Sequence, residues 1–198
     1  MACQPAFGVP SPSRCFRCMK QTVDFRVCAS CRPSVGMGHV WAMYPYQGYA
    51  KKLVKEFKFN AKRDAAKDIA GYLGHVVPHL PKDTIVVAVP TVPARVRSRG
   101  YDHATLLAKA FAARQSLLYL PALQRLNKHR QLGASRTERF AHMKDAFAVI
   151  NPKNIQGADI LLVDDVITTG ATLSSAAKAL RAAGARRVDA VVFAQTIL

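Results

Sequence analysis

Residues 160–173 read Ile-Leu-Leu-Val-Asp-Asp-Val-Ile-Thr-Thr-Gly-Ala-Thr-Leu, and this stretch decides the fold. Its apolar start, Ile160 to Val163, predicts a strand that is covered on both faces in a parallel sheet. Asp164 and Asp165 follow at the carboxyl end of that strand, where ligands bind in open α/β sheets. Their carboxylate oxygens suit ribose hydroxyls or a water-bridged Mg²⁺.

The loop after the two acids is rich in small and hydroxyl-bearing residues, and Gly170 lets the backbone approach a ligand closely. A helix is predicted from Leu173 to Ala183 and should end at Gly184. Its free N–H groups and positive dipole end point at the loop, so a phosphate fits there. The stretch therefore predicts a sugar-phosphate site, although an ordinary strand, turn and capped helix would have a similar sequence.

This run resembles the 5-phosphoribosyl 1-pyrophosphate (PRPP) motif of the type I phosphoribosyltransferases. By that resemblance, Asp164 and Asp165 are the catalytic acids and hold the ribose 2′- and 3′-hydroxyls. The resemblance also implies that the 5′-phosphate is held by Thr168, Thr169, Gly170, Ala171 and Thr172. Members that salvage 6-oxopurines carry an aspartate at the position of Thr168, so such an acceptor is disfavoured.

A second candidate site follows the predicted strand Ile85 to Val89. The turn there is Pro90, Thr91, Val92 and Pro93, and the residues after it include Arg95, Arg97 and Arg99. Guanidinium groups suit pyrophosphate oxygens, and Gly100 would let this loop fold over a ligand. A basic surface turn is the alternative.

Four of the five cysteines form two C-x-x-C pairs, Cys15 with Cys18 and Cys28 with Cys31, with nine residues between the pairs. Four thiolates on two tight turns predict a structural Zn²⁺ site with no open coordination position. Four reduced thiols or one redox pair remain the alternative. The role of Cys3 is left open.

The formal net charge of +17 comes from 29 Lys and Arg against 12 Asp and Glu, and it favours a polyanionic partner. The predicted nucleic-acid contacts are Lys51, Lys52, Lys55, Lys58 and Lys62. The apolar residues among them recur at helical intervals, so a solvated helix face would also explain these lysines. No apolar run is long enough to cross a bilayer, and the start lacks a secretory signal, so a cytoplasmic protein is expected.

Alternating strands and helices predict an α/β fold with a parallel sheet. Two units are expected, a zinc-binding segment over 1–36 and a larger domain over 37–198. Helices are predicted at 50–59, 61–77 and 102–115, the last with Asp102 as N-cap. Strands are predicted near Tyr119 and at 188–194, with 40–46 as an edge or hood strand.

The order of these parts is similar to the ComF family over nearly the whole chain. The matching features include Lys58-Phe59, Val89-Pro90-x-x-Pro93, Arg99-Gly100-Tyr101, Gln131, Arg139, Ala146-Phe147 and the PRPP motif. The family's usual Arg-Gly-Phe-Asn-Gln reads Arg-Gly-Tyr-Asp-His at 99–103, and His142 stands where an asparagine is usual.

The resemblance implies a type I phosphoribosyltransferase fold with a small hood, PRPP and Mg²⁺ as ligands, and a part in natural transformation beside single-stranded DNA and a helicase partner. The phosphoribosyl acceptor, and turnover itself, are left open. A nucleobase salvage enzyme and a PRPP-sensing protein without turnover are the alternatives.

Overall fold

The computed structural model describes residues 10–59, 63–126 and 146–196 of the chain. Its centre is a five-stranded sheet in the order β1-β7-β6-β2-β3, in which every neighbouring pair is parallel. The strands are β1 (Val40–Pro45), β2 (Ile85–Ala88), β3 (Leu118–Tyr119), β6 (Asp159–Ile167) and β7 (Arg187–Gln195). The predicted α/β class with a parallel sheet is confirmed.

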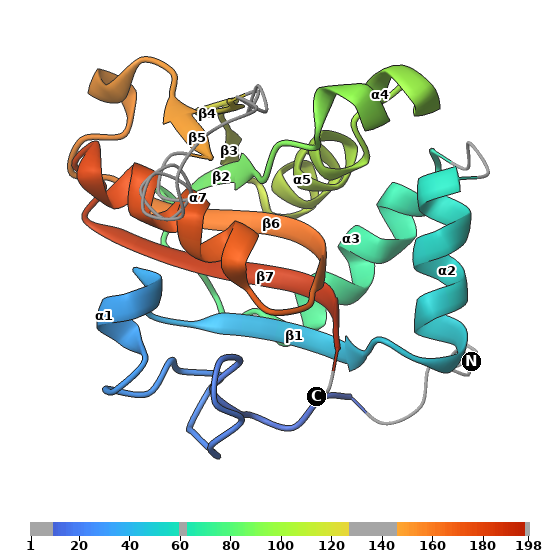
Figure 1. The fold of residues 1–198 in the computed structure, drawn as a ribbon, viewed down its shortest axis with the longest axis horizontal. Coiled ribbons are helices and arrows are strands. Elements are labelled where there is room, and N and C mark those ends of the chain that lie inside the picture. Colours follow the sequence, from blue (N-terminus) through green and yellow to red (C-terminus); the bar gives the residue numbers. More distant parts are fainter. Residues whose placement is uncertain (1–9, 60–62, 127–145, 197–198) are drawn as a thin grey trace, which may run out of the picture.

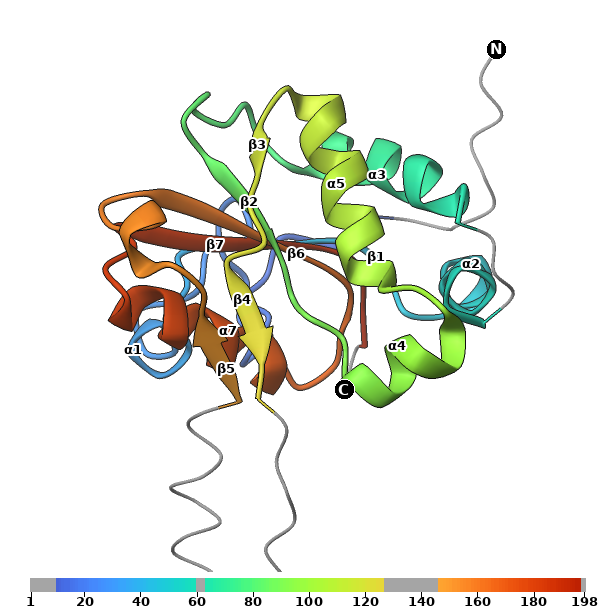
Figure 2. The same ribbon diagram turned by 90° about the horizontal axis from the view of Figure 1, so that it is seen from above.

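Helices cover both faces of this sheet (Figures 1 and 2). One face carries α2 (Gly48–Phe59), α3 (Ala65–Val76) and α5 (His103–Gln115). The other face carries α1 (Arg32–Val35), α7 (Ala171–Ala182) and the antiparallel pair β4 (Leu123–Arg125) and β5 (Phe147–Val149). Two short helices complete the described part, α4 (Pro93–Arg99) and the 3₁₀ turn η1 (Pro152–Asn154).

The alternation of side chains along β6 explains the two faces. Leu161 and Val163 belong to the apolar core under α3 and α5, whereas Ile160 and Leu162 belong to the core under α7. Successive side chains of a strand point to opposite faces, so a strand between two helical layers must be apolar at both its odd-numbered and its even-numbered positions. The same rule sends Asp164 and Asp165 to different faces of the sheet.

Several predicted boundaries shift. The strand predicted at 160–163 continues to Ile167, because β7 runs beside it as far as Gln195. The segment at 40–46 is an edge strand of the main sheet paired with β7, so it is not part of a hood. The helix predicted at 61–77 is α3, and α7 begins at Ala171, two residues before the predicted start.

The four-cysteine segment packs on the α7 face and does not form a separate core. Cys15, Phe16, Val27 and Val35 are buried in the same apolar cluster as residues of β6, β7 and α7. The predicted division at residue 36 stays a prediction, but this segment shares its core with the larger unit. Among the described residues, no helix combines the length and the apolar character that a membrane crossing needs.

Candidate functional site

The two acids of β6 become accessible because the neighbouring strand stops early. β2 ends at Ala88, which pairs with Val163, and the Val89 amide donates to the Val163 carbonyl at 3.1 Å. Beyond that point β6 is paired only on its β7 side, where Asp164 lies beside Val192. The carboxyl edges of β2 and β6 thus meet at one place, with the candidate loops directly after them.

Asp165 is buried, and each of its two carboxylate oxygens lies within 3.0 Å of a cation or potential cation. Its Oδ1 lies 2.9 Å from Lys58 Nζ at the end of α2, and its Oδ2 lies 3.0 Å from His103 Nε2 at the start of α5. Burial alone would raise the pKa of Asp165, but His103 and Lys58 outweigh it and hold that pKa below its usual range. Asp165 therefore joins two helices to the sheet. A ribose hydroxyl would have to compete with those ion pairs.

Asp164 has the opposite character. Its side chain is partly exposed, and its Oδ1 accepts the backbone N–H of Asp165 at 2.8 Å. Burial of the carboxyl, with the adjacent charge of Asp165, raises the pKa of Asp164 to about 8. Of the two acids, Asp164 lines a cavity of about 50 Å³ together with Thr168, Gly170 and Thr172. It is the acid that a ligand in this cavity would meet.

The predicted phosphate loop combines a left-handed glycine, exposed residues and the start of a helix. Gly170 is buried with φ at +74°, which a residue with a side chain rarely adopts, and its carbonyl accepts the Ser174 amide at 2.8 Å. The other four residues of the loop are exposed: Thr168, Thr169, Ala171 and Thr172. The first turn of α7 starts at Ala171, whose amide donates to the Thr169 hydroxyl at 3.4 Å, and the N–H groups that follow it open onto the same loop.

The second predicted site is a short helix and not an open turn. Pro93 occupies its first turn and Gly100, with φ at +76°, ends it. Because residues two apart on a helix do not share a face, Arg97 points away from the side that carries Arg95 and Arg99. The prediction that Arg95, Arg97 or Arg99 contacts the pyrophosphate stays a prediction, and on this helix Arg95 and Arg99 share a side. Gly100 caps this helix, so it does not form a closing loop.

Residues 91–103 tie this helix to Asp165. Asp102 is the N-cap of α5, as predicted, and accepts the Ala104 amide at 3.1 Å and the Thr91 hydroxyl at 2.7 Å. His103 Nδ1 lies 3.0 Å from Arg99 Nη1. The Asp-His pair in which this chain departs from the usual ComF sequence thus connects Thr91, Arg99 and the acidic centre. Pro90 and Val92 frame this segment; the Pro90 carbonyl accepts Arg125 Nη1 at 3.3 Å.

Arg125 is a site residue that the sequence did not single out. It belongs to β4, stacks over Phe147 at 5.1 Å and is half-buried. Burial and the charge of Arg95 lower the pKa of its guanidinium, while Asp164 raises it. Arg125 therefore brings positive charge toward Asp164, and Arg95 of α4 lies close enough to Arg125 to lower its pKa. No local pattern marks this arrangement, since β4 meets the site only in the folded chain.

The four cysteines come together as a metal site would require. Their Sγ atoms lie within 4.8 Å of one another, and Cys18 and Cys28 are 3.6 Å apart. Zn–S bonds of about 2.3 Å in a tetrahedron place sulfur atoms about 3.8 Å apart, so the cluster fits zinc. Burial raises the pKa of the Cys15 thiol, but backbone amides, led by that of Cys28, outweigh it and bring that pKa to about 7. A thiolate is the form that binds metal.

The lysines of α2 divide into two sets. Lys51, Lys52 and Lys55 are exposed, and Lys51 Nζ lies 5.9 Å from the Tyr46 ring centroid. Lys58 instead faces Asp165, with 21% of its side chain exposed. Lys62 lies outside the described residues. The exposed patch on α2 therefore consists of Lys51, Lys52 and Lys55.

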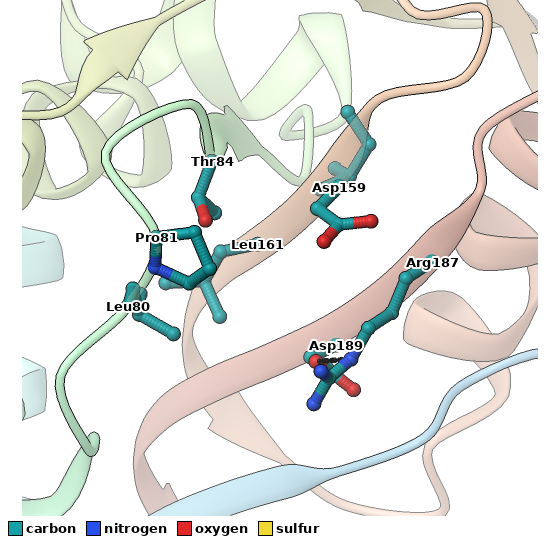
Figure 3. Close-up of a pocket in the computed structure, with 8 residues that line it drawn as sticks. Leu80, Pro81, Thr84, Asp159, Leu161, Arg187 and Asp189 are labelled. Carbon is teal, nitrogen blue, oxygen red and sulfur yellow. Dashed lines mark ion pairs between the residues drawn. The ribbon is translucent and has the colours of Figure 1, made fainter.

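A second hollow lies at the opposite edge of the sheet, at the amino ends of the strands (Figure 3). Its polar lining includes Thr84, Asp159 and Asp189, and Arg187 Nε lies 2.6 Å from Asp189 Oδ2. With a volume of about 20 Å³ it has room for roughly one water molecule. It is separate from the candidate site.

Comparison with known proteins agrees with this geometry. A model of the phosphoribosyl transferase domain matches residues 98–196, half of the chain, so the chain belongs to the phosphoribosyl transferase domain family. Competence protein ComFC of Streptococcus pneumoniae is 28% identical over 94% of this chain and 82% of its own length. ComFC of Bacillus subtilis is 28% identical over 84% and 70%, and competence protein F of Haemophilus influenzae is 34% identical over 52% and 47%. Within the family, this is a ComF-type protein.

Solved structures show the same fold in larger enzymes. One, described as the allosteric regulatory enzyme of purine biosynthesis, has a TM-score of 0.51 at 17% identity and covers 70% of this chain. The glutamine PRPP amidotransferase of B. subtilis has a TM-score of 0.50 at 19% identity over the same share. This chain spans 29% and 30% of those two chains. The type I phosphoribosyltransferase fold is thereby confirmed.

Proposed function

We propose that this ComF-type chain binds PRPP with Mg²⁺ at the carboxyl edge of β6 and β2 and serves DNA uptake in the cytoplasm, where it contacts single-stranded DNA. The observation that supports this proposal best is the loop at 168–172, in which a buried left-handed glycine, exposed hydroxyls and a helix start surround one cavity. Oriented N–H groups at such a place bind phosphate.

The remaining parts of PRPP have partners close by. Asp164 supplies a carboxylate for a ribose hydroxyl or for Mg²⁺ through water. Arg125 interacts electrostatically with both Asp164 and Arg95, so these two guanidinium groups offer positive charge to the pyrophosphate. Departure of pyrophosphate needs such charge neutralisation. If the protein turns over, it would be a phosphoribosyltransferase that moves a pentosyl group.

Titration calorimetry with PRPP and Mg²⁺ tests the binding, and its pH dependence tests the role of Asp164. Because the pKa of Asp164 is raised to about 8, the carboxyl is mostly protonated at neutral pH and must lose its proton to hold a cation. We expect affinity to rise between pH 6.5 and pH 8.5, by at most about tenfold per pH unit, and protons to be released on binding.

Asp164→Asn should weaken binding and remove this pH dependence. Asp159→Asn is the matched control, since Asp159 begins the same strand at its far end and pairs with Arg186. Absence of PRPP uptake by the wild-type protein would overturn the proposal. Assays of pyrophosphate release with free bases and with single-stranded DNA separate the three functional alternatives: rapid ribosylation of a base without DNA binding indicates a salvage enzyme, and PRPP binding without product indicates a sensor.

The DNA contact is assigned to the exposed patch on α2. Each lysine that contacts a phosphate of a single strand adds about 0.7 to the slope of log affinity against log salt. We expect Lys52→Glu with Lys55→Glu to lower affinity for an oligothymidylate and to reduce that slope by roughly 1.4. The control, Lys82→Glu with Lys153→Glu, changes the same charge on exposed residues outside α2. Equal losses in both double variants would show that net charge, and not this patch, binds the strand. The helicase partner remains an expectation from the ComF resemblance.

A further inference from the structure

Phe16 of the four-cysteine segment packs on the phosphate loop. Its ring is 5% exposed and lies against Gly170, where a Cβ atom would stand 3.0 Å from Cδ2 and 3.3 Å from Cζ of that ring, with Cε2 closer still. Real Cβ atoms essentially never come closer than 3.0 Å to another atom, and the approach to Cε2 lies below that limit. Gly170 is thus required twice, once by its backbone conformation and once by the ring that occupies the space beside it.

The backbone of Phe16 is fastened at the strand ends that lead into the loop. The Phe16 carbonyl accepts Nε2 of Gln195 at 3.2 Å, and Gln195 is the last residue of β7 and is itself buried. Gln195 pairs in register with Ile167, the residue before the loop, and the Thr196 amide donates to the Ile167 carbonyl at 2.9 Å. The contact is therefore anchored at the base of the loop as well as at Gly170.

The apolar core continues this connection on both sides of the loop. Ile167, which precedes the loop, and Leu173, which follows it, are buried in the same cluster as Cys15 and Phe16. Three residues of the loop between them are exposed threonines, whose side chains contribute little apolar packing. The position of the loop backbone then depends strongly on what packs against Gly170, and in this chain that is Phe16.

Phe16 is in turn held by the metal ligands. It lies between Cys15 and Cys18, on a turn in which the Met19 amide donates to the Cys15 carbonyl at 2.8 Å. A segment this short has too few apolar residues to order itself, so a bound metal supplies the folding free energy of such turns. Loss of the metal would release the turn and, with it, the ring of Phe16.

We propose that Phe16 is a positioning residue for the 5′-phosphate loop, so that metal bound by the four cysteines sets the affinity of the loop for a phosphorylated sugar. The proposal rests on the proposed PRPP function for its ligand. The contact itself is independent of that function, and the test has one readout for each.

The first readout uses no ligand. Hydrogen exchange of residues 168–172 is compared in the metal-loaded wild type, in Phe16→Ala and in wild type stripped by a chelator. We expect faster exchange in this loop in both altered forms, with β2 and α5 unchanged. Val23→Ala is the matched control, because Val23 belongs to the same segment and is 83% exposed. Unchanged exchange at 168–172 in both altered forms would overturn the proposal, whether or not the protein binds PRPP.

The second readout is PRPP affinity by calorimetry with zinc content measured in parallel. We expect Phe16→Ala to keep one zinc per chain and to lose roughly tenfold in affinity, with Phe16→Leu intermediate because it restores part of the packing. If Phe16→Ala loses zinc or fails to fold, Phe16→Leu takes its place, and wild-type affinity in that variant together with wild-type exchange would sink the proposal. Failure of the wild type to bind PRPP contradicts the proposed function alone.

Discussion

Cys28→Ser is expected to abolish tight zinc binding and to unfold the N-terminal segment. With one thiolate of four missing, the tetrahedral site is incomplete, and apparent binding free energies of about 10 to 16 kcal/mol for structural zinc show how much folding free energy such a site can supply. In the described part of the chain, the apolar core under α3 and α5 contains no buried residue of that segment, so the parallel sheet should stay folded with a lower melting temperature. Zinc analysis and hydrogen exchange over 10–36 measure the two effects.

Cys3→Ser is the control for that variant, because the cluster of four sulfur atoms is complete without Cys3. It should keep one zinc per chain and wild-type exchange. A Cys28→Ser protein that retains stoichiometric zinc with nanomolar affinity would contradict the four-thiolate site. A wild-type protein purified under reducing conditions that takes up no zinc would favour the alternative of reduced thiols.

Lys58→Met is expected to destabilise the protein by up to about 3 to 5 kcal/mol, since removal of one partner from a buried ion pair leaves a buried charge that His103 alone would have to compensate. The remaining partner is Asp165, whose side chain is 3% exposed. Lys55→Met on the same helix is the control, because Lys55 is exposed and its loss should cost less than about 0.5 kcal/mol. Urea unfolding at pH 7 measures both.

The stability difference between wild type and Lys58→Met should depend on pH, and the direction of that dependence follows from the pKa of Asp165. The pKa of Asp165 is lowered in the folded protein, so its contribution to stability is present above the unfolded value of about 3.9 and is lost as the pH falls through the folded value. The gap between wild type and Lys58→Met should therefore shrink as the pH falls toward and below about 4. A gap that is absent at pH 7, or that grows in acid, would show that Lys58 does not neutralise Asp165.

What the sequence predicted well rests on local signals. The apolar run before Asp164 predicted a central parallel strand, and Asp102 predicted the start of α5, because strand burial and helix capping are decided within a few residues. The helix at 93–99 had such signals as well, with Pro93 at its start and Gly100 just after its end, but they were interpreted as a turn.

What the sequence could not predict depends on contacts between distant segments. Nothing near Lys58 indicates that it meets Asp165 instead of solvent, because a lysine on an amphipathic helix is normally exposed. The approach of Phe16 to Gly170 and of Arg125 to Asp164 likewise follows from the packing of the α7 face. The spacing of the four cysteines in the sequence predicted a metal site, but it did not predict that this site lies beside the phosphate loop.

The opposite orientation of the two neighbouring aspartates has a consequence for how such proteins diverge. Asp165 contacts side chains of the helices that follow β1 and β2, whereas Asp164 faces the layer that holds the cysteines. Substitutions near the cysteines should leave the ion pair of Lys58 with Asp165 intact, whereas a change at Lys58 also reaches Asp164, because burial raises the pKa of Asp164 and the charge of Lys58 opposes that rise. A related protein could therefore change or lose the four-cysteine segment during evolution and still keep the ion pair between Lys58 and Asp165.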